Sequence, residues 1–269
     1  MSEESVTAHA PGSVTVLFRP APDGDGSHGV SFTTEDGVTA SLRPAATTAI
    51  TLDGSETEFE PVAGVLDRLG VTARVALDAA TPVGAGFGAS GAATLATALA
   101  ADELFDLDHD RSELVGFAHR AEAAAGTGLG DVFVQARGGL VYDVGDGRAR
   151  HARRDDIQYV SHSGIETEQV LGDESTMERV RTAAAAGFES FAPTAPLGDL
   201  FDHSRVFAEQ TGLVTDRVRD TLDEVAAVGG SGTMAMVGET VIATGAESVL
   251  PNATRVTPTA ARVIDSVER

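Results

Sequence analysis

Alternating hydrophobic and polar positions predict a series of β-strands in the first part of the chain. Residues 6–18 form a β-type segment, and we expect Pro11 and Gly12 to interrupt it. The stretch 21–29 is rich in Pro, Gly and Asp and predicts a loop. Beyond it, β-branched residues separated by turn signals predict short antiparallel strands at 30–34, 38–43 and 46–52. A last alternating segment, 71–78, leads into a glycine-rich loop.

Helical spacing of apolar residues accounts for most of the remaining chain. The first half is predicted to hold helices at 62–69, 92–101, 111–125 and 131–136, the second of them buried, and a strand at 139–144. The second half is predicted to hold helices at 173–187, 197–210 and 215–228, strands at 158–162, 233–238, 240–244 and 253–257, and a C-terminal helix at 259–267. This mixture predicts an α+β (mixed α/β) protein. The polar stretch 148–156 predicts a boundary between two domains, 1–150 and 151–269.

Composition removes several kinds of chemistry. The chain has no cysteine and no lysine, so all 19 basic residues are arginine. Thiolate nucleophiles, Cys-ligated metals, a Schiff-base lysine and a Walker A lysine are therefore excluded. The net charge of −22 argues against nucleic-acid binding, which needs a basic surface. The short acidic clusters favour a solvated surface adapted to high salt. Without a membrane-length apolar run or a signal peptide, we expect a cytoplasmic protein.

The strongest chemical signal is the glycine-rich stretch PVGAGFGASGA at 82–92. Its glycines allow positive φ and close approach of a ligand, and the helix that follows offers unpaired N–H groups. Such a loop favours a phosphate site, with the Ser90 hydroxyl in reach of a phosphate or a metal ion. Residues 86–91 also fit the Rossmann pattern, but a second helix follows where that fold needs a strand ending in an acidic residue. A plain strand–helix turn is the other alternative.

Three further residues complete a hypothesis of phosphoryl transfer. His119 and Glu122 share one face of the helix predicted at 111–125, and Asp131 ends the loop at 126–131. Each has an ordinary alternative: an interfacial histidine, a solvated glutamate and a helix N-cap. Together, Ser90 and Glu122 could hold Mg²⁺, and Asp131 could accept the proton of a substrate hydroxyl.

These motifs resemble those of the GHMP kinases, a superfamily of small-molecule kinases. The stretch at 82–92 resembles their phosphate-binding motif, APG at 10–12 their N-terminal motif, and GGSGTMAMVG at 229–238 their C-terminal glycine motif. Within the superfamily, the chain is most similar to archaeal pantoate kinases, through AE at 121–122, GTGLGDV at 126–132, GGLV at 138–141 and MAMVGETV at 234–241.

The resemblance implies a fold, an activity and a set of site residues. The fold would pair a domain like domain 2 of ribosomal protein S5 with a ferredoxin-like domain. The activity would be ATP-dependent phosphorylation of pantoate at its terminal hydroxyl, a step of coenzyme A synthesis. The implied ATP-binding residues are Pro82, Gly84, Gly86, Phe87, Gly88, Ala89, Ser90, Gly91 and Ala92. Ser90 and Glu122 would bind Mg²⁺, Asp131 would be catalytic, and the acceptor would meet Ser27, His119 and Thr167.

Two departures from the family pattern concern the charge of the acceptor site. Ser13 stands where a basic residue is common, and Tyr142 and Asp143 replace another basic residue. The carboxylate of an acid substrate needs a cationic partner, for which Arg19 and Arg137 are candidates that the sequence does not separate. Another acceptor (mevalonate type, homoserine or a sugar), or a non-catalytic nucleotide-binding regulator, remains an alternative, and a homodimer is left open.

Overall fold

The computed structural model describes residues 4–21, 27–128, 130–145, 147–162, 173–236 and 238–267. Its strands are β1 (Ser5–Pro20), β2 (Ser27–Pro44), β3 (Ala49–Leu52), β4 (Ser55–Glu56), β5 (Ala73–Ala79), β6 (Leu140–Asp143), β7 (Ala149–His151), β8 (Asp156–Ser161), β9 (Ser231–Met234), β10 (Thr240–Thr244), β11 (Asn252–Arg255) and β12 (Arg262–Val267). Its helices are α1 (Glu60–Leu69), α2 (Ala89–Leu104), α3 (Arg111–Ala124), α4 (Asp131–Gln135), α6 (Glu174–Ser190), α7 (Leu197–Thr211) and α8 (Asp216–Ala227).

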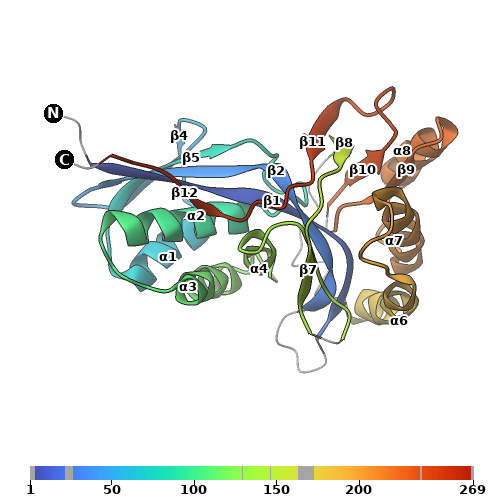
Figure 1. Cartoon of the computed structure of the whole chain (residues 1–269), viewed down its shortest axis with the longest axis horizontal. Helices are drawn as coiled ribbons and strands as arrows, with labels where there is room; N and C mark the ends of the chain where they lie inside the picture. The colour runs from blue at the N-terminus through green and yellow to red at the C-terminus, as the bar shows by residue number, and fades with distance from the viewer. Residues whose placement is uncertain are drawn as a thin grey trace.

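Two sheets organise the described residues. The larger sheet has eight strands, with the order β12-β1-β2-β5-β3-β4 and with β6 and β7 continuing from β2. The smaller sheet has four strands in the order β11-β8-β10-β9. In Figure 1, α1, α2 and α3 lie beside the larger sheet, while α6, α7 and α8 lie at the other end of the molecule around the smaller sheet. The predicted mixed α/β class is confirmed.

The strands β1 and β2 form a long antiparallel pair that connects the two ends of the molecule (Figure 1). The sequence predicted that Pro11 and Gly12 interrupt the first strand and that residues 30–43 form two strands. Both predictions are wrong. The register instead shifts between Pro11, opposite Gly37, and Gly12, opposite Thr34, which leaves two residues of β2 as a bulge. A Cβ at Gly37 would lie 2.1 Å from the Ala10 carbonyl oxygen, so the glycine is needed where the strands approach.

Each end of the β1–β2 pair packs against its own helices. The helix α2 contacts both strands at one end, and its small side chains are almost all buried. At the other end, α6 and α7 pack against β1. There Phe18 meets Phe207 and Phe32 meets Phe201, each pair with ring centroids 6.0 Å apart. The pair therefore spans two hydrophobic cores, and the segment between them is available for a site.

Two further predictions are corrected by strand pairing. The segment at 46–52 was expected to be antiparallel, but β3 pairs with β5 in parallel and with β4 antiparallel. The predicted C-terminal helix at 259–267 is instead the strand β12, which pairs antiparallel with β1. The open edge of β1 and the β-branched side chains of Val263, Ile264 and Val267 favour this strand over the helical period. The domain boundary at residue 150 stays a prediction.

Among the described helices, none has the length and apolar character that crossing a bilayer requires.

Candidate active site

The glycine-rich loop connects β5 to α2 and has the backbone shape that the sequence predicted. Gly84, Gly86 and Gly88 have φ angles of 78°, 82° and 60°, all in the left-handed region. Gly88 is also the N-cap of α2, so Ser90 lies in the first turn of that helix. A Cβ at Gly88 would lie 2.2 Å from Ser13 Oγ, and one at Gly86 would lie 3.2 Å from Ala235 Cβ. The loop thus needs glycine both for its conformation and for close packing.

The loop residues contribute to one cavity to different degrees. Gly84, Gly86, Gly88, Ala89, Ser90 and Gly91 line it. Phe87 points into the core, where its ring meets Tyr159 at a centroid distance of 4.9 Å, and its carbonyl accepts a hydrogen bond from the Ser13 N–H. Pro82 and Ala92 are not lining residues. The roles predicted for the nine loop residues in ATP binding stay predictions.

Glu122, on α3, is the centre of a hydroxyl network beside the loop. Its Oε1 accepts hydrogen bonds from Ser90 Oγ at 2.9 Å and Thr94 Oγ1 at 2.6 Å, and its Oε2 accepts one from Thr127 Oγ1 at 2.9 Å. Only 2% of Glu122 is exposed. Burial raises its pKa, as does the charge of Asp131, while the three hydroxyls oppose the increase. The network fixes the carboxylate beside the Ser90 hydroxyl.

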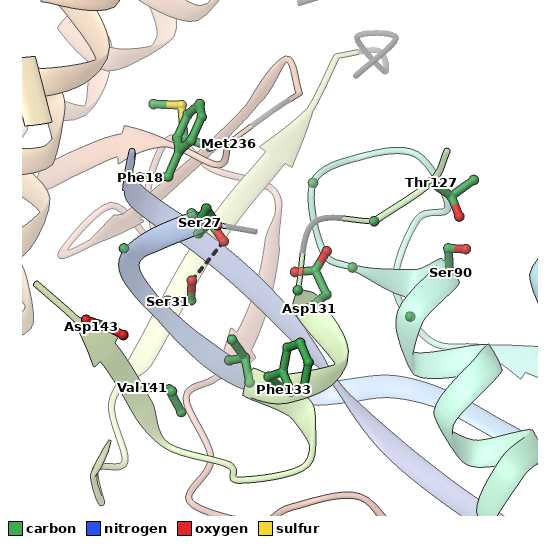
Figure 2. A pocket seen from close by; sticks show the side chains of 18 of the residues that line it. Phe18, Ser27, Ser31, Ser90, Thr127, Asp131, Phe133, Val141, Asp143 and Met236 are labelled. Atoms are coloured by element: carbon green, nitrogen blue, oxygen red, sulfur yellow. Dashed lines mark hydrogen bonds between the residues drawn. The ribbon is translucent and has the colours of Figure 1, made fainter. Parts of the chain in front are cut away.

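Asp131 begins α4 and faces the same cavity (Figure 2). Its Oδ1 accepts a 2.7 Å hydrogen bond from Ser13 Oγ. Gln135 Nε2 donates to Ser13 Oγ at 3.2 Å and to the Gly88 carbonyl at 2.8 Å. Burial raises the pKa of Asp131 and the hydrogen bond from Ser13 opposes this increase. A partly buried carboxylate with a raised pKa suits a general base.

The cavity has two sides, with Asp131 between them (Figure 2). Ser90 and Thr127 lie on the side of the glycine loop. The other side combines polar and apolar groups, including Ser27, Ser31, Val141 and Asp143. Further lining residues are Thr15, Phe133, Val134, Tyr142 and Arg148. Among the described residues, no group of three or more His, Cys, Asp or Glu side chains could hold a metal ion.

The three residues predicted to bind the acceptor are placed differently. Ser27, the first residue of β2, lines the cavity. His119 is not a lining residue, and its ring packs against Phe133 with centroids 4.7 Å apart. Thr167 lies outside the described residues. All three roles stay predictions.

Several cavity and support residues were not singled out by sequence reasoning as functional. Thr127 could have been found, because it lies in the predicted loop between Glu122 and Asp131. Ser13 was noticed only as a departure from a pattern, and its contact with Asp131 spans 118 positions. Thr94, Gln135 and Arg148 had no local signal, since the tertiary fold alone brings them to the site.

Comparisons with known proteins agree with this geometry. Residues 59–139, which include the glycine loop, Glu122 and Asp131, match the family model described as the GHMP kinases N terminal domain. The chain is 29% identical to a pantoate kinase of Methanospirillum hungatei, over 91% of this chain and 90% of the relative. It is 24% identical to a pantoate kinase of Methanocaldococcus jannaschii, over 64% of each chain. The chain therefore contains a GHMP kinase N-terminal domain at residues 59–139.

Solved structures of GHMP kinases share the fold. A phosphotransferase related to the CoA biosynthesis pathway superposes with a TM-score of 0.84 at 20% identity, covering 96% of this chain and 98% of that one. A mevalonate-3-kinase from Thermoplasma acidophilum gives a TM-score of 0.68 at 13% identity, covering 99% and 100%. The predicted GHMP kinase architecture is confirmed, and the sequence relatives indicate a small-molecule kinase.

Proposed function

We propose that this GHMP kinase transfers the γ-phosphoryl group of ATP to the terminal hydroxyl of pantoate, giving 4-phosphopantoate for coenzyme A synthesis. The observation that carries the proposal is the similarity to a pantoate kinase along 91% of the chain. The cavity supports it, because Phe133, Val134 and Val141 offer apolar contact to the two methyl groups of pantoate. Ser27 and Ser31 add hydroxyls for the hydroxyl and carboxylate groups of pantoate.

In this proposal the glycine loop binds the triphosphate without a lysine. The N–H groups at the start of α2 and the positive end of its dipole face the phosphates. Left-handed glycines at 84, 86 and 88 let the backbone approach the phosphate oxygens. The chain has no lysine to neutralise the remaining phosphate charge, and in this proposal a metal ion does so.

The Ser90–Glu122 pair fits Mg²⁺, which prefers oxygen ligands and keeps several water and phosphate oxygens. Ser90 Oγ donates a hydrogen bond to Glu122 Oε1, which leaves the lone pairs of the Ser90 oxygen for a cation. The hydroxyls of Thr94 and Thr127 hold the Glu122 carboxylate in place. When bound, Mg²⁺ would neutralise charge on the phosphate oxygens.

Asp131 is the proposed base. It takes the proton of the pantoate hydroxyl as that oxygen forms its bond to the γ-phosphorus, and the bond between the γ-phosphorus and the bridging oxygen of ADP breaks. Ser13 and Gln135 hold Asp131 against the glycine loop, so the base and the triphosphate are fixed relative to one another. The cytoplasmic location and the homodimer stay predictions.

The test is ADP release, measured at multimolar and at low KCl, with pantoate, mevalonate, homoserine and galactose as acceptors. We expect turnover with pantoate and a dependence on Mg²⁺. Turnover of another acceptor without turnover of pantoate would contradict the proposed substrate. Binding of ATP without turnover of any acceptor would favour a nucleotide-binding regulator.

A further inference from the structure

The acceptor side of the cavity contains one strongly basic side chain. Of the described residues that line the cavity, only Arg148 is an arginine, and the chain has no lysine. Asp131 and Asp143 line the same cavity and carry the opposite charge. A carboxylate ligand that enters this space meets two like charges, so it needs a cation in contact with it to bind.

Arg148 is placed close to the proposed base by two elements. Its guanidinium carbon lies 4.6 Å from the centroid of the Phe133 ring. Phe133 is part of the short helix α4, two residues after Asp131. In the β6–β7 pair, Tyr142 lies opposite Ala149, so Arg148 comes next to Asp143 at the end of the ladder. The guanidinium therefore lies over the ring of Phe133, two residues along the chain from the proposed base, and Arg148 lines the cavity.

Arg148 forms no ion pair with a carboxylate among the described residues. Asp143 instead lies 3.1 Å from His28 Nδ1 and accepts a 3.1 Å hydrogen bond from the Gly145 N–H. Burial lowers the pKa of Arg148, the charge of Arg137 lowers it further, and the charge of Asp143 raises it. An anion bound at Arg148 would offset both unfavourable effects, because opposite charge favours the protonated guanidinium.

The two arginines that the sequence offered are in other positions. Arg19 lies over the Phe188 ring of α6, with its guanidinium carbon 5.3 Å from the ring centroid. Arg137 follows α4 and, like Arg148, is exposed. Neither Arg19 nor Arg137 is among the residues that line the cavity. The structure thus separates candidates that the sequence could not.

We propose that Arg148 binds the carboxylate of the acceptor and makes the enzyme selective for a hydroxy acid. This inference rests on the proposed function, since it assumes that the acceptor is an acid such as pantoate. The planar guanidinium presents a pair of N–H donors that matches both oxygens of a carboxylate. The stacking of Arg148 on Phe133 limits the orientation of the guanidinium, so less freedom is lost when the acid binds.

The experiment compares pantoate with its neutral amide, pantoamide, in the wild type and in three variants. Arg148→Gln removes the charge, Arg148→Lys keeps it without the paired donors, and Arg137→Gln is a matched control outside the cavity. For Arg148→Gln we expect kcat/KM for pantoate to fall about 100-fold, mainly through KM, because the carboxylate is at the opposite end of the acceptor from the transferred group. The kcat/KM for pantoamide and the KM for ATP should be unchanged. Arg148→Lys should have an intermediate kcat/KM for pantoate, and Arg137→Gln should resemble the wild type.

The outcomes separate this inference from the proposed function. Suppose that the wild type phosphorylates pantoate, but Arg148→Gln lowers kcat/KM for pantoate and for pantoamide equally, or lowers neither. Arg148 then does not recognise the carboxylate, and the inference is overturned while the proposed function stands. If the wild type does not phosphorylate pantoate, the proposed function fails and the inference fails with it. A thermal melt of each variant identifies a folding defect. If Arg148→Gln does not fold, Arg148→Lys decides, and equal selectivity of that variant and the wild type overturns the inference.

Discussion

Ser13 Oγ donates a 2.7 Å hydrogen bond to Asp131 Oδ1. The contact connects the middle of β1 to the first residue of α4. Ser13 also donates its backbone N–H to the Phe87 carbonyl and accepts a hydrogen bond from Gln135. One serine therefore holds the proposed base against the glycine loop.

Replacing Ser13 should change the pH dependence of catalysis. The hydrogen bond from Ser13 lowers the pKa of Asp131, so Ser13→Ala should raise that pKa further above its ordinary value. The acidic limb of the kcat/KM profile should move to higher pH, and kcat should fall roughly tenfold as the base loses its orientation. Ser41→Ala is the control, because Ser41 bonds Thr7 away from the site. An unchanged acidic limb in Ser13→Ala would show that Ser13 does not act on the base.

Asp131→Asn should lose activity and gain stability at neutral pH. Removal of a general base lowers kcat by about 100-fold or more. Burial raises the pKa of Asp131 in the folded state, so folding favours its protonated form. The stabilisation from that proton is complete below the ordinary pKa of aspartate and is lost as pH rises through the raised pKa.

The matching measurement is a set of thermal melts of Asp131→Asn and the wild type between acidic and neutral pH. The melting temperature of the variant should exceed that of the wild type near pH 7, and the difference should shrink toward acid. A difference that grows toward acid, or full-rate ADP release by the variant, contradicts the assignment.

Thr127→Val should weaken the response to Mg²⁺ with little effect on folding. The Thr127 hydroxyl donates to Glu122 Oε2 at 2.9 Å and lowers the pKa of that carboxylate. Its loss should raise the Mg²⁺ concentration needed for half-maximal rate by roughly fivefold to tenfold, equivalent to about 1 kcal/mol for one hydrogen bond. Thr72→Val, which removes a hydroxyl bonded to the Ala45 carbonyl at 2.7 Å, is the control. Equal Mg²⁺ titrations for the wild type and Thr127→Val would exclude this role.

Alanine at two loop glycines should separate backbone strain from steric clash. Gly84 and Gly88 both have positive φ, at 78° and 60°. A Cβ at Gly84 meets nothing within 4 Å, so Gly84→Ala should cost only about 1 kcal/mol of backbone strain. A Cβ at Gly88 would lie 2.2 Å from Ser13 Oγ and 3.0 Å from Asp131 Cγ, so Gly88→Ala should destabilise more and should also displace the base. Urea unfolding and kcat of both variants test this order, which similar losses would contradict.

Stability should increase with salt. The chain carries 41 acidic residues against 19 arginines, and Glu122 alone among the described acidic residues is buried. Apart from Asp131 in the cavity, the other described carboxylates repel one another at or near the surface, and salt screens this repulsion. Thermal melts from low to multimolar KCl should show a rising melting temperature. A maximum at low salt would contradict the prediction of adaptation to high salt.

The sequence determined the fold class, most helices and the glycine loop, because these depend on local patterns. The Gly and Pro residues at 11–12 were misread because a turn signal is also compatible with a bulge when a long partner strand is present. The C-terminal strand β12 was missed because its short apolar pattern fits a helix or a strand, and only the free edge of β1 decides between them. Ser90, Glu122 and Asp131 were selected as one site from motifs and the family resemblance.

The tertiary structure decided how that site is supported and charged. Ser13, Thr94 and Gln135 act through hydrogen bonds between distant segments, and no local pattern encodes such contacts. The sequence left the cation for the acceptor open between Arg19 and Arg137, but the structure places Arg148 in the cavity because β6 and β7 return the chain to α4. Local propensity follows from the sequence alone, whereas the position of a charge relative to a cavity depends on how the segments pack.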